Sequence, residues 1–184
     1  MDITTRSTMI KDEEVTTYLF RGEEEIRRTL RDITMPRPSV LYQKSCGFIN
    51  ASTADEFANQ MLADQELYKK QSGLRIRVND ITIAKSELHY GRETHELKGI
   101  ADSMAAYYAA EGFPTVYDVW MLNENTYKIT FAISVVSPVD GRKYTWNDKE
   151  KYEREKRALD TIAYRVIGKT KPNEEFNFVI QENH

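Results

Sequence analysis

The stretch Thr115–Val136, TVYDVWMLNENTYKITFAISVV, decides the fold. It contains two runs rich in β-branched and aromatic residues, separated by the polar tetrapeptide Asn123–Thr126. From Tyr127 to Val135 apolar residues alternate with residues that are mostly polar, which is the period of a strand with one buried face. Strands joined by so short a turn lie side by side in opposite directions, so the stretch predicts an antiparallel pair.

Further strands are predicted on both sides of this pair. Residues 74–90, LRIRVNDITIAKSELHY, alternate between apolar and polar side chains across Asn79 and Asp80. Because this dipeptide accepts positive backbone angles, a hairpin that turns there is favoured, and one long strand is the alternative. A turn leads into RKYTW at residues 142–146, and FNFVI at residues 176–180 predicts a last strand.

Four segments have the pattern of amphipathic helices, with apolar residues three and four positions apart. The first is short and follows Gly22, and its acids precede its bases, which suits the helix dipole. The others are expected from a cap at Ser52 or Thr53 to about Lys70, from about Thr94 to Glu111, and from Asn147 to Gly168. Together the segments predict the α+β class: a mainly antiparallel sheet of about five or six strands, with three to four helices packed on one face.

One boundary is predicted, at MPRPS, Met35–Ser39. Two prolines one residue apart exclude a helix interior and favour extended chain. We therefore expect residues 1–34 to form an N-terminal arm or small subdomain and residues 35–184 to form a single α+β domain. A chain of 184 residues suits this organisation, because it is long enough to bury a substantial core without disulfides.

Composition excludes several classes of function. With 26 Lys and Arg against 29 Asp and Glu the formal charge is -3, so no global attraction to a polyanion is expected. Cys46 is the only cysteine, which excludes an internal disulfide and a zinc cage of thiolates. No apolar run approaches the roughly 18 residues of a membrane span, and no phosphate-binding glycine loop or nucleophile elbow occurs. We expect a cytoplasmic protein with no membrane contact, metal or cofactor.

HYGRETH, residues 89–95, comes closest to a catalytic signature because it holds two of the three histidines. A hairpin followed by a helix, with His89 leaving the last strand, resembles in outline the ββα-metal nuclease family. That resemblance implies a general base at His89 and a divalent ion near Glu93, His95 or Asp102. The family's Asp-His pair on the early strand is missing here, since only apolar residues stand at the matching positions. The interpretation that we favour is a structural corner between a strand and a helix.

Two segments combine positive charge with features of a binding surface. In the first, five basic residues stand against one acid: Arg27, Arg28, Arg31, Arg37 and Lys44. The second, GRKYTWNDKEKYEREKR at residues 141–157, mixes cations with flat rings, a combination suited to phosphates and unstacked bases. Its predicted binding residues are Arg142, Lys143, Tyr144, Trp146 and Tyr152. Acids at three-and-four spacing in the same segment also fit a solvated helix that pairs with itself.

The predicted function is non-enzymatic binding of a macromolecule, a protein and/or a nucleic acid, through the shape and charge of the surface. The setting that we favour is an accessory protein of a phage or mobile element that inhibits a host nuclease complex, as anti-CRISPR proteins do. A metal-dependent nuclease of the ββα type and a DNA-binding regulatory protein are the alternatives.

Asp118 and Lys128, on neighbouring strands, are expected to form only an exposed ion pair. The oligomeric state stays open.

Overall fold

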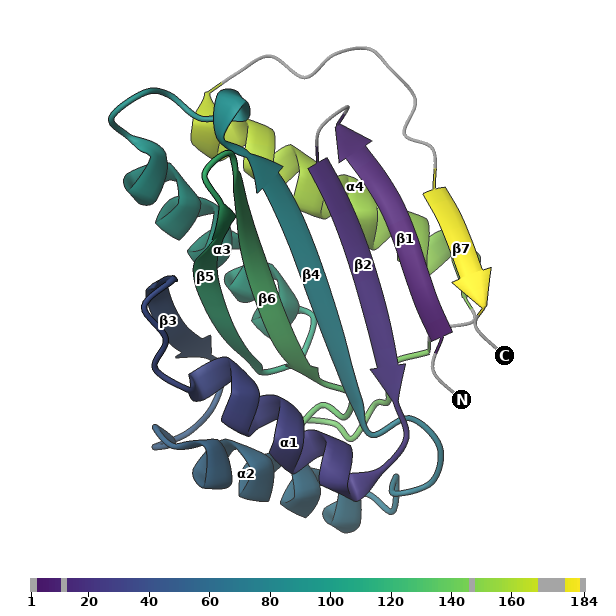
Figure 1. The fold of residues 1–184 in the computed structure, drawn as a ribbon. Coiled ribbons are helices and arrows are strands. Elements are labelled where there is room, and N and C mark those ends of the chain that lie inside the picture. The colour runs from purple at the N-terminus through teal and green to yellow at the C-terminus, as the bar shows by residue number, and fades with distance from the viewer. Residues whose placement is uncertain (1–2, 11–12, 146–147, 169–177, 183–184) are drawn as a thin grey trace.

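Seven strands form one antiparallel sheet in this computed structural model, which describes residues 3–10, 13–145, 148–168 and 178–182 (Figure 1). Side chains are described for residues 17–145 and 148–168. The strands are β1 (Ile3–Ile10), β2 (Glu13–Phe20), β3 (Val40–Cys46), β4 (Ile76–Ala84), β5 (Thr115–Asn123), β6 (Thr126–Ser134) and β7 (Phe178–Glu182). Their order across the sheet is β3-β5-β6-β4-β2-β1-β7. The predicted α+β class with an antiparallel sheet is confirmed, and the sheet is larger than expected.

Four helices and one short turn of 3-10 helix complete the described chain. They are α1 (Glu23–Thr34), α2 (Ala54–Leu67), η1 (Lys85–Glu87), α3 (Glu93–Ala110) and α4 (Lys149–Ile167). Each predicted helix is therefore present, with ends that differ by a few residues. The Thr53 hydroxyl caps α2 by accepting from the Glu56 N–H, and the Asp148 carboxylate caps α4 in the same way from the Lys151 N–H.

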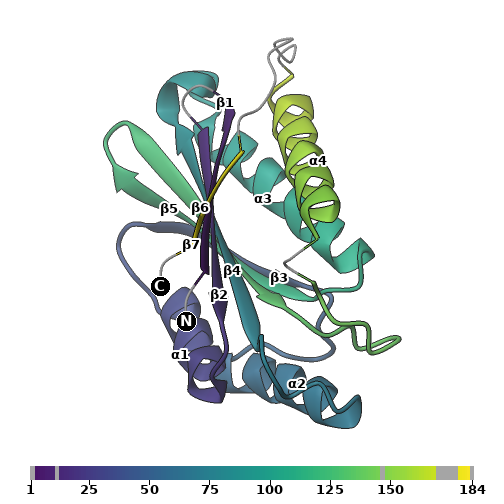
Figure 2. The same ribbon diagram turned by 90° about the vertical axis from the view of Figure 1, so that its right-hand side faces the viewer.

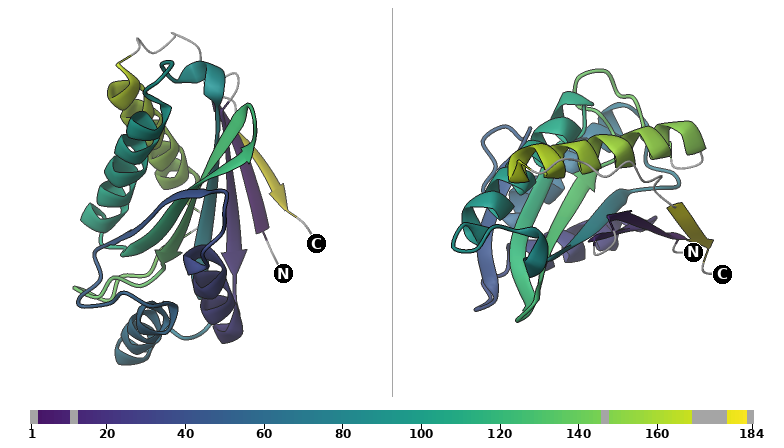
Figure 3. Two further views of the ribbon diagram at one scale, coloured as in Figure 1. Left: turned by 60° about the vertical axis from the view of Figure 1, so that its left-hand side comes forward. Right: turned by 90° about the horizontal axis from the view of Figure 1, so that it is seen from above.

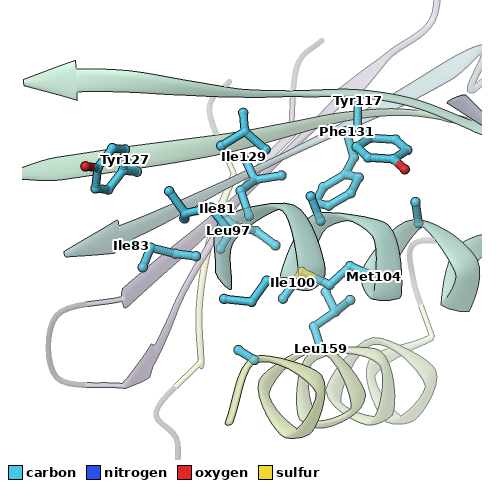
Figure 4. Packing of buried hydrophobic residues seen from close by; sticks show 14 of the residues in the cluster. Ile81, Ile83, Leu97, Ile100, Met104, Tyr117, Tyr127, Ile129, Phe131 and Leu159 are labelled. Atoms are coloured by element: carbon cyan, nitrogen blue, oxygen red, sulfur yellow. The ribbon is translucent and has the colours of Figure 1, made fainter. Parts of the chain in front are cut away.

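The main core lies between the sheet and the helix pair α3 and α4, which run over one face (Figures 2 and 3). Alternate residues of β4, β5 and β6 point into it, as the period of a strand requires. Figure 4 shows how they meet Leu97, Ile100 and Met104 of α3 and Leu159 of α4. Gly99 of α3 lies close to Val166 of α4, so the two helices approach each other closely here. This core fixes the relative position of α3 and α4.

A second core lies on the opposite face, where α1 packs and α2 packs against α1. Its sheet residues are Ile76, Val116 and Ala132, which alternate with the residues of the main core. The helices were predicted to lie on one face, and the structure differs because the central strands carry apolar residues on both faces at this end. Strands that are buried on both sides need a cover on both sides.

Strand β4 corrects the predicted hairpin at Asn79 and Asp80, since both residues lie within one continuous strand. Asn79 is buried, accepts a hydrogen bond from the Thr17 hydroxyl at 2.7 Å and donates to the Tyr108 hydroxyl at 2.6 Å. Asp80 accepts from Thr130 at 2.8 Å. Neighbouring elements thus satisfy both polar side chains, so the chain has no need to turn there. The alternative prediction of one strand is confirmed for Ile76–Ala84, but the strand ends there and η1 follows, so the prediction that His89 leaves a strand is wrong.

The first and last segments join the same sheet. β2 pairs with β4 from Glu14 to Phe20, and β1 pairs with both β2 and β7. The predicted last strand exists as β7, although residues 176–177 of that prediction lie outside the described residues. Residues 142–145 form a bridge from Lys143 to Val136 instead of a strand. Residues 3–34 therefore contribute two strands and one helix to layers that the rest of the chain also builds.

Candidate nucleic-acid interface

Most of the predicted basic and aromatic residues of the second segment meet at a pocket of about 220 Å³. Four parts of the chain form it: Arg77 of β4, the end of α3 with the residues that follow it, the first turns of α4 and the segment 142–145. Figure 2 shows the green segment that precedes α4 at the lower ends of both helices. We call this hollow the α3–α4 pocket.

A buried ion pair forms the floor of the α3–α4 pocket. The Arg77 guanidinium donates two parallel hydrogen bonds to the Glu155 carboxylate, at 2.7 and 2.8 Å. Burial would raise the pKa of the Glu155 carboxyl, but the charge and hydrogen bonds of Arg77 hold it below its ordinary value. Arg77 lies between two rings, with Cζ at 3.9 Å from the Tyr144 centroid and 5.4 Å from the Tyr108 centroid. The floor is therefore rigid and internally neutral.

Aromatic side chains form the walls. Tyr107, Phe113 and Tyr144 line the pocket, and the Phe113 and Tyr144 rings stand perpendicular with centroids 6.2 Å apart. Tyr107 is half-buried and packs edge-on against Tyr108 at 5.9 Å. Burial, with nearby Glu155 and Glu111, raises the pKa of Tyr107 to about 12, so its hydroxyl stays neutral in the physiological range. The walls can offer ring faces and edges to a ligand.

Cations surround the opening. Arg142 donates to the Glu111 carbonyl, and Lys143 donates to the carbonyls of Lys70 and Ser72, so both side chains are held in place. Partial burial, and then the charges of Arg75, Lys70 and Arg21, lower the pKa of Lys143. Burial is the main cause of this shift, and the smaller contributions of three cations show that positive charge gathers near Lys143 although the chain as a whole is slightly negative.

Two further cations, Lys151 and Arg154, line the same pocket from α4 and are exposed. Within the described part of the chain, neither has a carboxylate within 4.0 Å. The acidic residues of the lining are Glu111 and Glu155, and the second is already neutralised by Arg77. Ion pairs within α4 were predicted, and Lys149 does pair with Glu153. Lys151 and Arg154 are not used in this way, so their charges are available to an anion.

The structure treats the predicted residues of this segment differently. Arg142, Lys143 and Tyr144 line the pocket, whereas Tyr152 is buried at 6% exposure with its ring 4.7 Å from the Lys156 ammonium. Trp146 lies outside the described residues. Sequence reasoning missed Arg77, Tyr107 of α3 and Glu111, which follows α3, although an arginine between two apolar residues of a strand was an available signal.

The first basic segment does not form one surface. Arg27 turns toward α2, where its guanidinium donates to Asn59 at 3.1 Å and lies 3.8 Å from Asp55. Arg31 is exposed and donates to the Arg27 carbonyl at 3.2 Å. Lys44 lies on β3 near Asp102, whose charge is the largest cause of the raised pKa of Lys44. These three cations therefore face different parts of the molecule.

Arg28 and Arg37 line a second hollow, of about 310 Å³, between α1 and the sheet face opposite to α3 and α4. Arg28 forms an ion pair with Glu25, and Arg37 binds Asp118 at 2.5 Å and lies 5.7 Å from the Trp120 ring. Asp118 is therefore buried and paired with Arg37, and the exposed pair that was predicted with Lys128 is wrong. Lys128 instead lies 3.6 Å from Asp80.

The corner at residues 89–95 is held by Glu96, the first buried residue of α3. Its carboxylate accepts from the His89 backbone at 2.7 Å and meets the His89 ring at 2.9 Å. His95 is exposed, and Asp102 accepts from the hydroxyls of Tyr42 at 2.9 Å and Tyr117 at 2.6 Å. Among the residues that the structure describes, no three His, Cys, Asp or Glu side chains lie close enough to hold a metal ion.

Glu93 is partly exposed at the start of α3 and lines a shallow hollow with Tyr90 and Leu88. The predicted set of His89, Glu93, His95 and Asp102 is therefore not brought together at one point. In the described chain no helix is long and apolar enough to cross a membrane.

Comparisons with known proteins place the chain in no family. No protein-family model and no curated protein matches it. It is similar in structure to a chain described under the words "Molecular Basis of Vancomycin Resistance Transfer in Staphylococcus aureus", with a TM-score of 0.45, 12% sequence identity and 70% of each chain covered. A likeness of this size indicates no function.

Proposed function

We propose that this protein is a non-enzymatic nucleic-acid-binding protein that holds phosphate groups at the rim of the α3–α4 pocket. The observation that carries the proposal is the meeting of Arg142, Lys143, Lys151 and Arg154 around one ring-lined hollow. All four belong to the basic segment 141–157: Arg142 and Lys143 precede α4, and Lys151 and Arg154 lie in its first turns. Such a combination of cations and rings is typical of surfaces that bind nucleic-acid strands.

Local charge, not net charge, supports the attraction. A phosphate strand responds to the potential within about 10 Å at ordinary salt, so a basic rim attracts it even when the net charge is negative. Backbone carbonyls hold the side chains of Arg142 and Lys143, so binding costs less side-chain entropy there. Lys151 and Arg154 stay exposed and can adapt to the spacing of the phosphates.

Fluorescence anisotropy with labelled oligonucleotides tests the proposal. The double variant Lys151→Glu with Arg154→Glu reverses two rim charges, and we expect binding at least about tenfold weaker at low salt. The matched control is Arg157→Glu with Arg165→Glu, two exposed residues of α4 outside the pocket lining with the same change of charge. Equal weakening in both variants would indicate general electrostatics and would contradict a site at this pocket.

Salt dependence provides a second measurement. If Lys151 and Arg154 each neutralise one phosphate of a single strand, the slope of log Kd against log salt should fall by about 1.4 in the pocket variant. The control variant should keep the slope of the unmodified protein. An unchanged slope in the pocket variant would show that these two residues do not contact phosphate.

As the biological setting, we propose that the protein inhibits a host nuclease complex, as anti-CRISPR proteins do. A surface that binds nucleic acid can compete with a nuclease for its guide or target strand. The assay adds the protein to a nucleic-acid-loaded nuclease and follows cleavage, with the two charge variants beside it. Cleavage that is equally fast with and without the unmodified protein would remove this setting and leave nucleic-acid binding to be judged separately.

A further inference from the structure

We infer that the α3–α4 pocket takes one unpaired nucleobase, so that the protein selects single strands over duplexes. This inference rests on the proposed function and specifies its ligand. In a duplex the bases are stacked inside and their faces are not available, whereas a single strand can turn a base outward. A surface that bound only phosphates would need no hollow beneath its cations.

The size and walls of the pocket suit a base. Its volume of about 220 Å³ lies below the roughly 300–1,000 Å³ that take drug-sized ligands, so one flat ring system fits better than a larger molecule. Tyr107 and Tyr144 supply ring surface from two different elements, α3 and the segment before α4. Stacking on such rings tolerates any base, because every base has a π face.

The floor supplies a polar group that has no partner. Arg77 is 1% exposed, and its Nε is a buried donor without a hydrogen-bond partner in the described chain, while both terminal nitrogens bind Glu155. A buried donor without an acceptor is costly, so an acceptor that reaches it gains free energy. The ring nitrogens and carbonyl oxygens of a base are such acceptors. A ligand acceptor at the inner edge of the pocket would satisfy this donor once the Tyr144 ring, which lies over the guanidinium, moves aside.

The rim cations lie where the backbone of that nucleotide would leave the pocket. Arg142 lies 5.7 Å from the Phe113 ring, so a wall ring and a rim cation are neighbours. Arg154 is close enough to Tyr107 for its charge to affect the pKa of the phenol. A base held at these rings would bring its phosphate near the cations, and the backbone contacts that already hold Arg142 and Lys143 favour binding.

The test compares Tyr107→Ala, Tyr107→Phe and Tyr90→Ala in anisotropy assays with a single strand and a hairpin duplex of the same length and label. Tyr107→Ala should weaken binding of the single strand about 5- to 100-fold and leave the weaker duplex binding unchanged. Tyr107→Phe keeps the ring and should bind as the unmodified protein does. Tyr90→Ala removes a tyrosine that is 97% exposed outside the pocket and should have no effect. Thermal melting of each variant reports folding independently.

Each outcome separates the two proposals. Equal affinity for single strand and duplex, with equal loss in Tyr107→Ala, would overturn base insertion while leaving phosphate binding at the rim intact. No binding of either oligonucleotide by the folded protein would overturn both. A matched RNA strand shows whether the sugar matters, and preference for an acidic protein over both strands would also contradict the inference.

Discussion

Replacing Asp118 by asparagine should change how the stability of this protein depends on pH. Asp118 is 1% exposed, and burial raises the pKa of its carboxyl to about 7 from 3.8, against the opposing charge and hydrogen bond of Arg37. One of its oxygens, Oδ1, has no hydrogen-bond partner in the described chain. The ionised form is therefore poorly solvated in the folded state, and folding favours the protonated form.

The sign and size of the effect follow from these two pKa values. Because the folded pKa is the higher one, the stabilising contribution of protonation is fully present below about pH 3.8 and is lost as the pH rises through about 7. Between pH 6 and pH 8 the carboxyl gives up about 0.8 of a proton, and it does so in the folded state only. The resulting loss of unfolding free energy is about 1.4 kcal/mol over that range.

Urea unfolding at pH 6, 7 and 8 and constant ionic strength measures this loss. Other groups titrate in the same range: burial lowers the pKa of Lys156 to about 7, which acts with the opposite sign. These groups are common to both proteins, so the difference in unfolding free energy between wild type and Asp118→Asn cancels them. That difference should favour the wild type by about 1.4 kcal/mol more at pH 6 than at pH 8. Parallel curves would refute the reasoning.

Arg37→Met provides a check on the cause. Arg37 lies at 2.5 Å from Asp118 and lowers its pKa, so its removal should raise the pKa further and move the pH-dependent loss of stability to higher pH. The same variant removes a cation from the ring of Trp120, 5.7 Å away. A midpoint that moves to lower pH would show that another group controls the titration.

Two further predictions concern the scaffold. Arg77→Met should lower the unfolding free energy by about 3–5 kcal/mol, because it leaves Glu155 buried without its partner. Adding Glu155→Met to this variant should recover part of that loss. If the two losses are simply additive in a double-mutant cycle, the residues are not a coupled pair. Gly141→Ala should destabilise far more than Gly91→Ala in thermal melting. Both glycines have positive φ, 72° at Gly141 and 77° at Gly91, so the backbone strain of an alanine is similar at the two positions. A Cβ at position 141 would lie 2.2 Å from the Tyr68 ring, whereas a Cβ at position 91 would meet nothing within 4 Å. Equal melting temperatures of the two variants would contradict this steric argument.

The parts of the fold that the sequence predicts are those with strong local patterns. The pair β5 and β6 is predicted because its alternation and its turn stand within one stretch, and α3 because its apolar residues recur at helical spacing. β1 and β2 escape prediction because threonine, serine and charged residues interrupt any apolar alternation in residues 3–16. β2 takes its place by pairing with β4, more than fifty residues away in the chain, and β1 then pairs with β2, which no local pattern encodes.

The predicted hairpin within β4 fails for a related physical reason. Asn79 and Asp80 have high turn propensity, but propensity is outweighed once tertiary partners satisfy the side chains. Thr17, Tyr108 and Thr130 supply those partners from β2, α3 and β6. Three separate elements must be in place before the strand becomes the better conformation, so the sequence of β4 alone favours the wrong answer.

The candidate site shows the same division between local and distant information. Sequence spacing predicts that Arg142, Lys143 and Tyr144 lie together, because they are neighbours in the chain. Spacing in the sequence cannot predict that Arg77 of β4 lies beneath the Tyr144 ring. Nor can it predict that Glu155 pairs with Arg77, because that pair forms only when α4 packs against the sheet. The pair neutralises the one acid at the floor, and this leaves the rim with its positive charge. A buried contact between distant elements, not the basic stretch by itself, therefore turns a mixed-charge helix start into a surface suited to an anion.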